Sequence, residues 1–155
     1  MTVSVAGVLH DSICGGIAAA GFGVLFNVGF RTVPLCVGSG FLALAVRTSA
    51  LSLGWGFEAS SFAAALTLGL AVQLLPSSIR VSRNVLHVVG CIPMIPGAFA
   101  ARAILALFAI TQSASPTNDA HSAAMAFGLR VIFTLGALGT GLAIPALFLR
   151  SRQDP

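Results

Sequence analysis

Three arginines lie inside long apolar stretches of this sequence, and they are Arg47, Arg102 and Arg130. If these stretches cross a membrane, each guanidinium there costs at least about 2.5 kcal/mol, so such residues commonly serve a function. A guanidinium can hold a carboxylate through two parallel N–H···O bonds. The pattern therefore predicts a site for a carboxylate. The alternative interpretation is that the side chains extend to the outer interface of the membrane that the helices cross, or pair with a partner subunit.

A second chemical feature is the run Ile92-Pro93-Met94-Ile95-Pro96-Gly97, which has apolar residues on both sides. Pro93 and Pro96 each remove a backbone donor and clash with the preceding helical turn, and Gly97 adds a flexible joint. A helix broken at Pro93, Pro96 and Gly97 exposes free N–H groups at the start of its second half, and these favour an anion. Arg102 lies about one and a half turns beyond this start. We therefore expect Arg47, Arg102, Arg130 and the residues of the break to contact substrate.

Other polar residues give weaker signals. Asn27 is expected to bond across helices or to line a substrate path. His87 is expected near the cytoplasmic interface, partly solvated, and it forms no relay with the other histidines. Cys14, Cys36 and Cys91 lack the spacing of a metal site and are expected to be buried packing residues. We expect no metal and no cofactor. The run Gly38-Ser39-Gly40 resembles the nucleophile of an intramembrane protease, but no suitably placed histidine accompanies it.

The amino-acid composition indicates the kind of structural element that positions these residues. The 155 residues are 57% hydrophobic and 8% charged, with a mean hydropathy of +0.99. Soluble domains are about a quarter charged, so this is an all-α integral membrane protein. The net charge of +4 comes from arginines scattered among apolar runs, which indicates orientation in a lipid bilayer rather than binding of nucleic acid.

Hydropathy predicts one polytopic domain over residues 1–155 with about five transmembrane helices. An unbroken helix over residues 84–111 would be about 40 Å long, which exceeds a hydrocarbon core of about 30 Å, so this segment needs a break or a strong tilt. The first span is rich in small residues and is expected to pack closely in the bundle. The longest loop is expected over residues 112–122. The predicted spans are residues 13–30, 34–53, 59–75, 84–111 and 123–149.

The distribution of charge predicts the orientation. With five spans, five arginines fall on one side of the membrane, whereas the acids Asp11, Glu58 and Asp119 fall in loops or helix ends on the other. Arginines near helix ends accumulate on the cytoplasmic side, so we expect the N-terminus outside and the C-terminus in the cytoplasm of the cell inner membrane. The five arginines are Arg31, Arg80, Arg83, Arg150 and Arg152.

Three stretches together resemble the threonine/serine exporter family, in particular its small membrane subunit. They are residues 21–27 (GFGVLFN), residues 92–97 (IPMIPG) and residues 136–145 (GALGTGLAIP). Their order and spacing follow the family pattern over nearly the whole chain, from Gly21 to Arg150. Arg47 also matches a family position, whereas Arg102 and Arg130 have no counterpart in the pattern.

The resemblance implies export of small carboxylate-bearing metabolites, either threonine and serine or, in a two-subunit branch, a dicarboxylate such as succinate. It also implies a larger membrane partner of the same family. Two five-span halves of opposite orientation would form the inverted repeat common in secondary transporters. The alternative is a non-transporting membrane subunit that assembles or regulates its partner. A membrane-embedded enzyme is disfavoured, because no nucleophile–base pair and no embedded acid are predicted.

Overall fold

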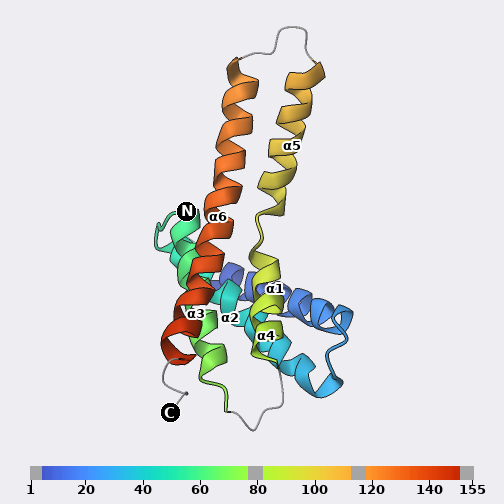
Figure 1. The fold of residues 1–155 in the computed structure, drawn as a ribbon, viewed down its shortest axis with the longest axis vertical. Coiled ribbons are helices and arrows are strands. Elements are labelled where there is room, and N and C mark those ends of the chain that lie inside the picture. The colour runs from blue at the N-terminus through green and yellow to red at the C-terminus, as the bar shows by residue number, and fades with distance from the viewer. Residues whose placement is uncertain (1–4, 77–81, 113–117, 151–155) are drawn as a thin grey trace. The chain divides into compact units, whose positions relative to one another are not determined.

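The computed structural model describes residues 5–76, 82–112 and 118–150, and the described residues form helices without strands (Figure 1). This confirms the all-α class. Two short 3-10 helices, η1 (Phe30–Thr32) and η2 (Ile92–Met94), interrupt the α-helices. The α-helices are α1 (Val5–Leu25), α2 (Val33–Ser52), α3 (Phe57–Gln73), α4 (Arg83–Cys91), α5 (Gly97–Gln112) and α6 (Asn118–Arg150).

Contacts divide the chain into two compact units. The first unit comprises residues 1–94 and 137–155, and the second comprises residues 95–136. The division falls directly after η2, inside the predicted break, and again within α6.

In the first unit, α1 and α2 meet through small residues. A Cβ added to Gly40 would lie 2.5 Å from the Cβ of Ala19, and one added to Gly15 would lie 2.5 Å from Cδ1 of Leu44. Neither position has room for a side chain, so the two backbones approach closely, as small residues permit in membrane helices. This confirms the close packing expected of the first span.

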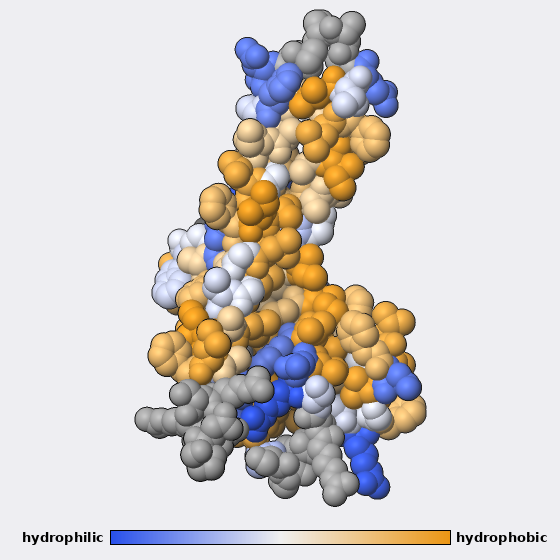
Figure 2. All heavy atoms as spheres, in the orientation of Figure 1, coloured by the Kyte–Doolittle hydropathy of each residue, from blue (hydrophilic) through white to orange (hydrophobic). Residues whose placement is uncertain are grey.

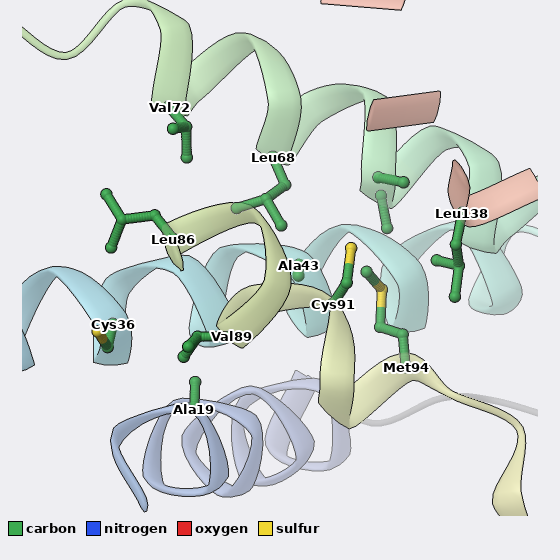
Figure 3. Close-up of a cluster of buried hydrophobic side chains, with 12 residues drawn as sticks. Ala19, Cys36, Ala43, Leu68, Val72, Leu86, Val89, Cys91, Met94 and Leu138 are labelled. Carbon is green, nitrogen blue, oxygen red and sulfur yellow. The ribbon is translucent and has the colours of Figure 1, made fainter. Parts of the chain in front are cut away.

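The core of the first unit lies where α4 meets α2 and α3 (Figure 3). Leu68, Leu86, Val89 and Met94 are 1% exposed or less. Cys36 and Cys91 belong to this core, as predicted, but Cys14 is exposed, so that part of the prediction is wrong. The core reaches to Met94 and thus fixes the chain directly before the break.

Among the described residues, three helices have the length and apolarity of a membrane span: α1, α2 with the preceding η1, and α6. The broken segment of α4, η2 and α5 passes the same test when it is taken as one span. α3 has 17 residues, or about 26 Å, near the lower limit for a span, so the count of five stays a prediction. The visible surface is largely apolar (Figure 2), as the lipid environment requires.

Two helices extend beyond the spans predicted for them, for a shared reason. α1 begins at Val5 rather than near residue 13, so Asp11 lies inside a helix, where it pairs with His10 at 3.4 Å. α6 begins at Asn118, so the expected loop ends earlier than residue 122. Polar residues end an apolar run without ending a helix, and Asn and Asp favour a first turn. Arg80 and Arg152, which support the predicted orientation, lie outside the described residues.

Candidate functional site

The helix is broken at the predicted place. α4 ends at Cys91, η2 covers Ile92–Met94, and α5 begins at Gly97. In a continuous helix the carbonyl of Met94 would accept a hydrogen bond from the N–H of Ala98, four residues later. The break removes that donor, and a buried carbonyl without one costs about 1–3 kcal/mol.

Arg47 supplies the missing donor. Its Nη1 donates to the carbonyl oxygen of Met94 at 3.0 Å, and the side chain is 8% exposed. Its Cζ lies 4.2 Å from the centre of the Phe57 ring, a cation–π contact. Both partners are neutral, and no carboxylate pairs with Arg47 in the described part of the chain. A guanidinium has five N–H donors, so this buried charge at the break retains donors for an anion.

The start of α5 offers fewer free donors than expected. The N–H of Gly97 donates to the carbonyl of Ile95 at 2.8 Å, and those of Phe99 and Ala100 donate to the carbonyl of Pro96 at 3.1 Å each. Among the first four N–H groups of α5, only that of Ala98 has no hydrogen-bond partner in residues 5–76, 82–112 and 118–150. The backbone contribution to an anion site at Pro96 and Gly97 is therefore narrowed to this single donor.

Arg102 and Arg130 come together in the second unit through two phenylalanines. The rings of Phe99 and Phe127 stack with their centres 6.2 Å apart and their planes inclined by 20°. Cζ of Arg102 lies 5.8 Å from the Phe127 ring centre, and Cζ of Arg130 lies 5.0 Å from that of Phe99. We call these four residues the arginine–phenylalanine cluster. Both arginines are exposed, so the cluster presents two positive charges held by one aromatic pair.

Asn27 has a role at a helix end. Its backbone is left-handed, with φ of 56°. Its N–H donates to the carbonyl of Val24 at 2.9 Å, and the N–H of Val28 donates to that of Gly23 at 3.0 Å. This pair of bonds is the Schellman motif, in which Asn is a common substitute for Gly. The side chain of Asn27 is exposed, and its contact with substrate stays a prediction.

Sequence reasoning misplaced His87. The side chain is 8% exposed rather than partly solvated, and the helix that carries it, α4, packs on α3. Its Nε2 is enclosed and has no partner among the described residues. The sequence does contain a signal for the burial of His87. Leu86, Val89 and Cys91 near it on α4 are apolar, and all three are buried.

Other features of the described residues do not form a polar site. A groove of about 170 Å³ between α2, α3 and α4 is lined by apolar side chains and by Ser39, so it does not suit a carboxylate. The hydroxyl of Ser39 donates to the carbonyl of Cys36 at 2.8 Å. No cluster of three or more metal-ligating side chains occurs in the parts of the chain that the structure covers.

Comparison with known families identifies the chain's class. The family described as "Threonine/Serine exporter, ThrE" matches residues 11–148, a range that includes the break and the three arginines. No solved structure matches the chain. The matched range covers most of the sequence, and the fold is that of a helical, multi-pass membrane protein. The family is one of transporters rather than enzymes, and the chain belongs to the threonine/serine exporter family.

Proposed function

We propose that the chain is one half of a secondary transporter that exports small carboxylate metabolites, and that it works with a larger membrane partner. The substrate is threonine or serine, or a dicarboxylate such as succinate. Membership of an exporter family supports the transport role. The residues proposed to contact substrate are Asn27, Arg47, Pro93, Pro96, Gly97, Arg102 and Arg130.

The observation that carries this proposal is the position of Arg47. Its guanidinium is buried, bonded to the Met94 carbonyl at the break and stacked on Phe57, and no carboxylate among the described residues pairs with it. A buried charge with neutral partners strongly favours an incoming charge of opposite sign. A broken helix at membrane depth is tolerated where it lies within protein or lines a water-filled cavity. Both features suit a site that takes up a substrate carboxylate.

The arginine–phenylalanine cluster suggests which substrates are accepted. Two guanidinium groups on one aromatic pair provide charge for two carboxylates, which favours a dicarboxylate over an amino acid with one. An amino acid also carries an ammonium group, which two nearby cations would repel. Efflux of succinate is therefore to be compared with that of threonine and serine.

Two features support a partner. Of the residues of α5, Ala103 alone is buried, and large apolar side chains including Leu105 (67% exposed) and Phe108 (56%) face outward. The charge distribution favours an external N-terminus and a cytoplasmic C-terminus in the inner membrane. A half with this orientation complements a half that starts in the cytoplasm, as in transporters with inverted repeats.

The competing function is a non-transporting subunit that assembles or regulates its partner. It predicts that the arginines are dispensable for flux, provided that the complex still forms. Efflux of radiolabelled threonine, serine and succinate from proteoliposomes holding the chain and its co-purified partner tests both functions. Under our proposal Arg47→Gln reduces efflux at least about tenfold, equivalent to about 1.4 kcal/mol.

Arg31→Gln is the matched control. Arg31 is exposed in η1, and its substitution removes the same charge as Arg47→Gln. It should leave efflux near that of the unaltered protein. Normal efflux by Arg47→Gln in an intact complex would favour the assembly role. If no candidate substrate leaves the vesicles, the proposed substrate class is rejected.

A further inference from the structure

The apolar groove of the first unit has the length of one lipid leaflet. It is lined by residues of α2 between Pro34 and Leu42, residues of α3 between Leu68 and Leu75, and Leu86 of α4. Figure 3 labels two of the α3 and α4 side chains that line it, Leu68 and Leu86. At 1.5 Å per residue the stretch of α2 along the groove is about 12 Å long, against about 15 Å for the hydrocarbon of one leaflet.

The walls of the groove suit hydrocarbon. Ser39 is the one side chain with a polar atom among the described residues that line it, and its hydroxyl already donates to the carbonyl of Cys36 at 2.8 Å. The volume of about 170 Å³ would otherwise be filled by several water molecules of about 30 Å³ each, without polar partners on the walls. The groove is therefore a place for part of an acyl chain.

The guanidinium of Arg83 lies at one end of this groove. Its Nη2 donates to the carbonyl of Leu75, which lines the groove, and its Nη1 donates to Oε1 of Gln73, each at 3.2 Å. Leu86 follows Arg83 by three residues on the same face of α4. Both partners of Arg83 are neutral, and they take two of its five N–H groups, so donors remain for a phosphate.

No acid of the first unit is placed to neutralise Arg83. Among the described residues this unit contains two acids, Asp11 and Glu58, and its third, Asp154, lies outside them. Glu58 is in the first turn of α3, about 22 Å along the helix from Gln73. Asp11 lies on α1 one turn before Gly15, which packs on Leu44, so it is near the far half of α2.

The charges at this end select the headgroup. Arg31 is exposed in η1, which directly precedes α2, so it lies at the same end of the unit as Pro34. A zwitterionic headgroup carries a cationic nitrogen, which the two arginines repel and which no nearby acid holds. A net negative headgroup meets only attraction. The orientation predicted from charge places this end in the cytoplasmic leaflet, where basic pockets between helices bind anionic lipids.

We propose that the groove and Arg83 form a binding site for one anionic phospholipid, with an acyl chain between α2, α3 and α4 and the phosphate on the guanidinium. Since the three helices line the groove together, the bound lipid stabilises their packing. The site does not include the proposed substrate residues. It therefore stands or falls independently of export.

The site is tested by native mass spectrometry of the full chain purified in a mild detergent. The chain is titrated with dioleoylphosphatidylglycerol and, separately, with dioleoylphosphatidylcholine, which has the same acyl chains and no net charge. We expect one phosphatidylglycerol to bind at least about tenfold more tightly than phosphatidylcholine, as a charge-assisted contact provides. Arg83→Gln should abolish this preference and leave the affinity for phosphatidylcholine unchanged, whereas Arg83→Lys should keep most of it.

A second variant tests the groove without changing charge. Gly38 lines the groove, and a Cβ added there meets nothing within 4 Å, so Gly38→Leu fills the space that the acyl chain would occupy. It should weaken both lipids. Gly21→Leu is its matched control, because Gly21 on α1 has the same free space and does not line the groove. Arg31→Gln is the control for charge, and both controls should stay within about twofold, since exposed charges are screened.

Three results would overturn the proposal: equal affinities for the two lipids, an undiminished preference in Arg83→Gln, or normal binding by Gly38→Leu. If Arg83→Gln does not fold, the comparison of lipids in the unaltered chain and the effect of Gly38→Leu still decide. Weaker binding of both lipids by Arg83→Gln would assign Arg83 to the packing of α3 on α4 and reject its contact with phosphate. None of these measurements involves efflux, so failure of the proposed function leaves the lipid site standing.

Discussion

Nη1 of Arg47 on α2 lies 3.0 Å from the carbonyl oxygen of Met94, at the end of η2. This bond replaces the helical hydrogen bond that the break removes, so a side chain from another helix completes the backbone of the broken one. The same guanidinium is the buried positive charge of the first unit at the break. Arg47 therefore has a structural function and a proposed binding function, which mutations can separate.

Arg47→Met separates them, because methionine has a similar volume and no charge. Replacing a buried ionic group with a well-packed apolar one is often neutral or stabilising, whereas the Met94 carbonyl would lose its donor, at about 1–3 kcal/mol. We expect a modest change in thermal stability in detergent, together with loss of most substrate efflux. Arg47→Lys keeps the charge and should retain part of the efflux. A variant Arg47→Met that transports normally would contradict a role in substrate binding.

The glycines of α6 provide a matched pair for stability. A Cβ at Gly141 would lie 2.8 Å from the Cβ of Ala65 and 2.9 Å from the carbonyl oxygen of Phe62, whereas one at Gly139 would meet nothing within 4 Å. Gly141→Ala should therefore destabilise the protein by about 1–3 kcal/mol, the usual cost of overpacking. Gly139→Ala should be neutral or slightly stabilising, since Ala favours helix. Thermal unfolding of both variants, followed by circular dichroism, compares them, and equal midpoints would contradict this packing of α6 on α3.

The left-handed backbone of Asn27 gives a second stability test. Asn27→Gly should retain or improve stability, because Gly adopts φ near 56° without strain. Asn27→Val should cost about 1–2 kcal/mol, since a β-branched residue is strained there. Efflux by Asn27→Gly then reports on the amide alone. Normal efflux in this variant would exclude a substrate contact by Asn27.

The fold class and the break could be predicted from the sequence because their causes are local. Two prolines and a glycine within Pro93–Gly97 prevent a continuous helix whatever the surroundings. The partner of the orphaned Met94 carbonyl could not be predicted, because Arg47 is 47 residues away in the sequence. Hydropathy shows that Arg47 is buried but not which backbone group it reaches.

Helix ends and burial of single polar residues were harder to predict. Asp11 and Asn118 ended the apolar runs, yet both lie in helices, because helix ends depend on capping and not on hydropathy. His87 was expected near water because it lies close to the cytoplasmic end of the predicted span over residues 84–111. The side chain is buried because α4 packs on α3, a contact between helices that no local pattern encodes.

The predicted orientation is tested by cysteine accessibility. Single cysteines at Ser122, in the first turns of α6, and at Ser151 are introduced into a protein without native cysteines. A membrane-impermeant maleimide added to intact cells should label position 122 and should label position 151 only after the membrane is permeabilised. Labelling of both from the same side would contradict a membrane crossing by α6 between the two positions, and with it the five-span model.

The arginine–phenylalanine cluster makes the sharpest prediction about substrate. If its two charges bind two carboxylates, Arg102→Gln and Arg130→Gln should each raise the half-saturating concentration of succinate. Loss of a charge-assisted hydrogen bond costs about 1.5–3 kcal/mol, or roughly tenfold to a hundredfold in affinity. For threonine, which has one carboxylate, at most one of the two substitutions should have this effect.

Because both arginines contact one stacked pair of rings, their effects should not be independent. The double variant should differ from the sum of the single variants by more than about 0.5 kcal/mol, the usual limit for additive sites. Phe127→Leu leaves both charges present but removes the cation–π contact of Arg102, since leucine has no aromatic ring. The Arg102 guanidinium should then be held less firmly, and succinate transport should be weaker. Initial rates in proteoliposomes with matched protein content give these values, and Arg31→Gln is the control for net charge. Additive effects, or equal effects on succinate and threonine, would contradict binding of two carboxylates by the cluster. The cluster would then stabilise the packing of the helices or contact the membrane surface, and substrate would bind at Arg47 instead.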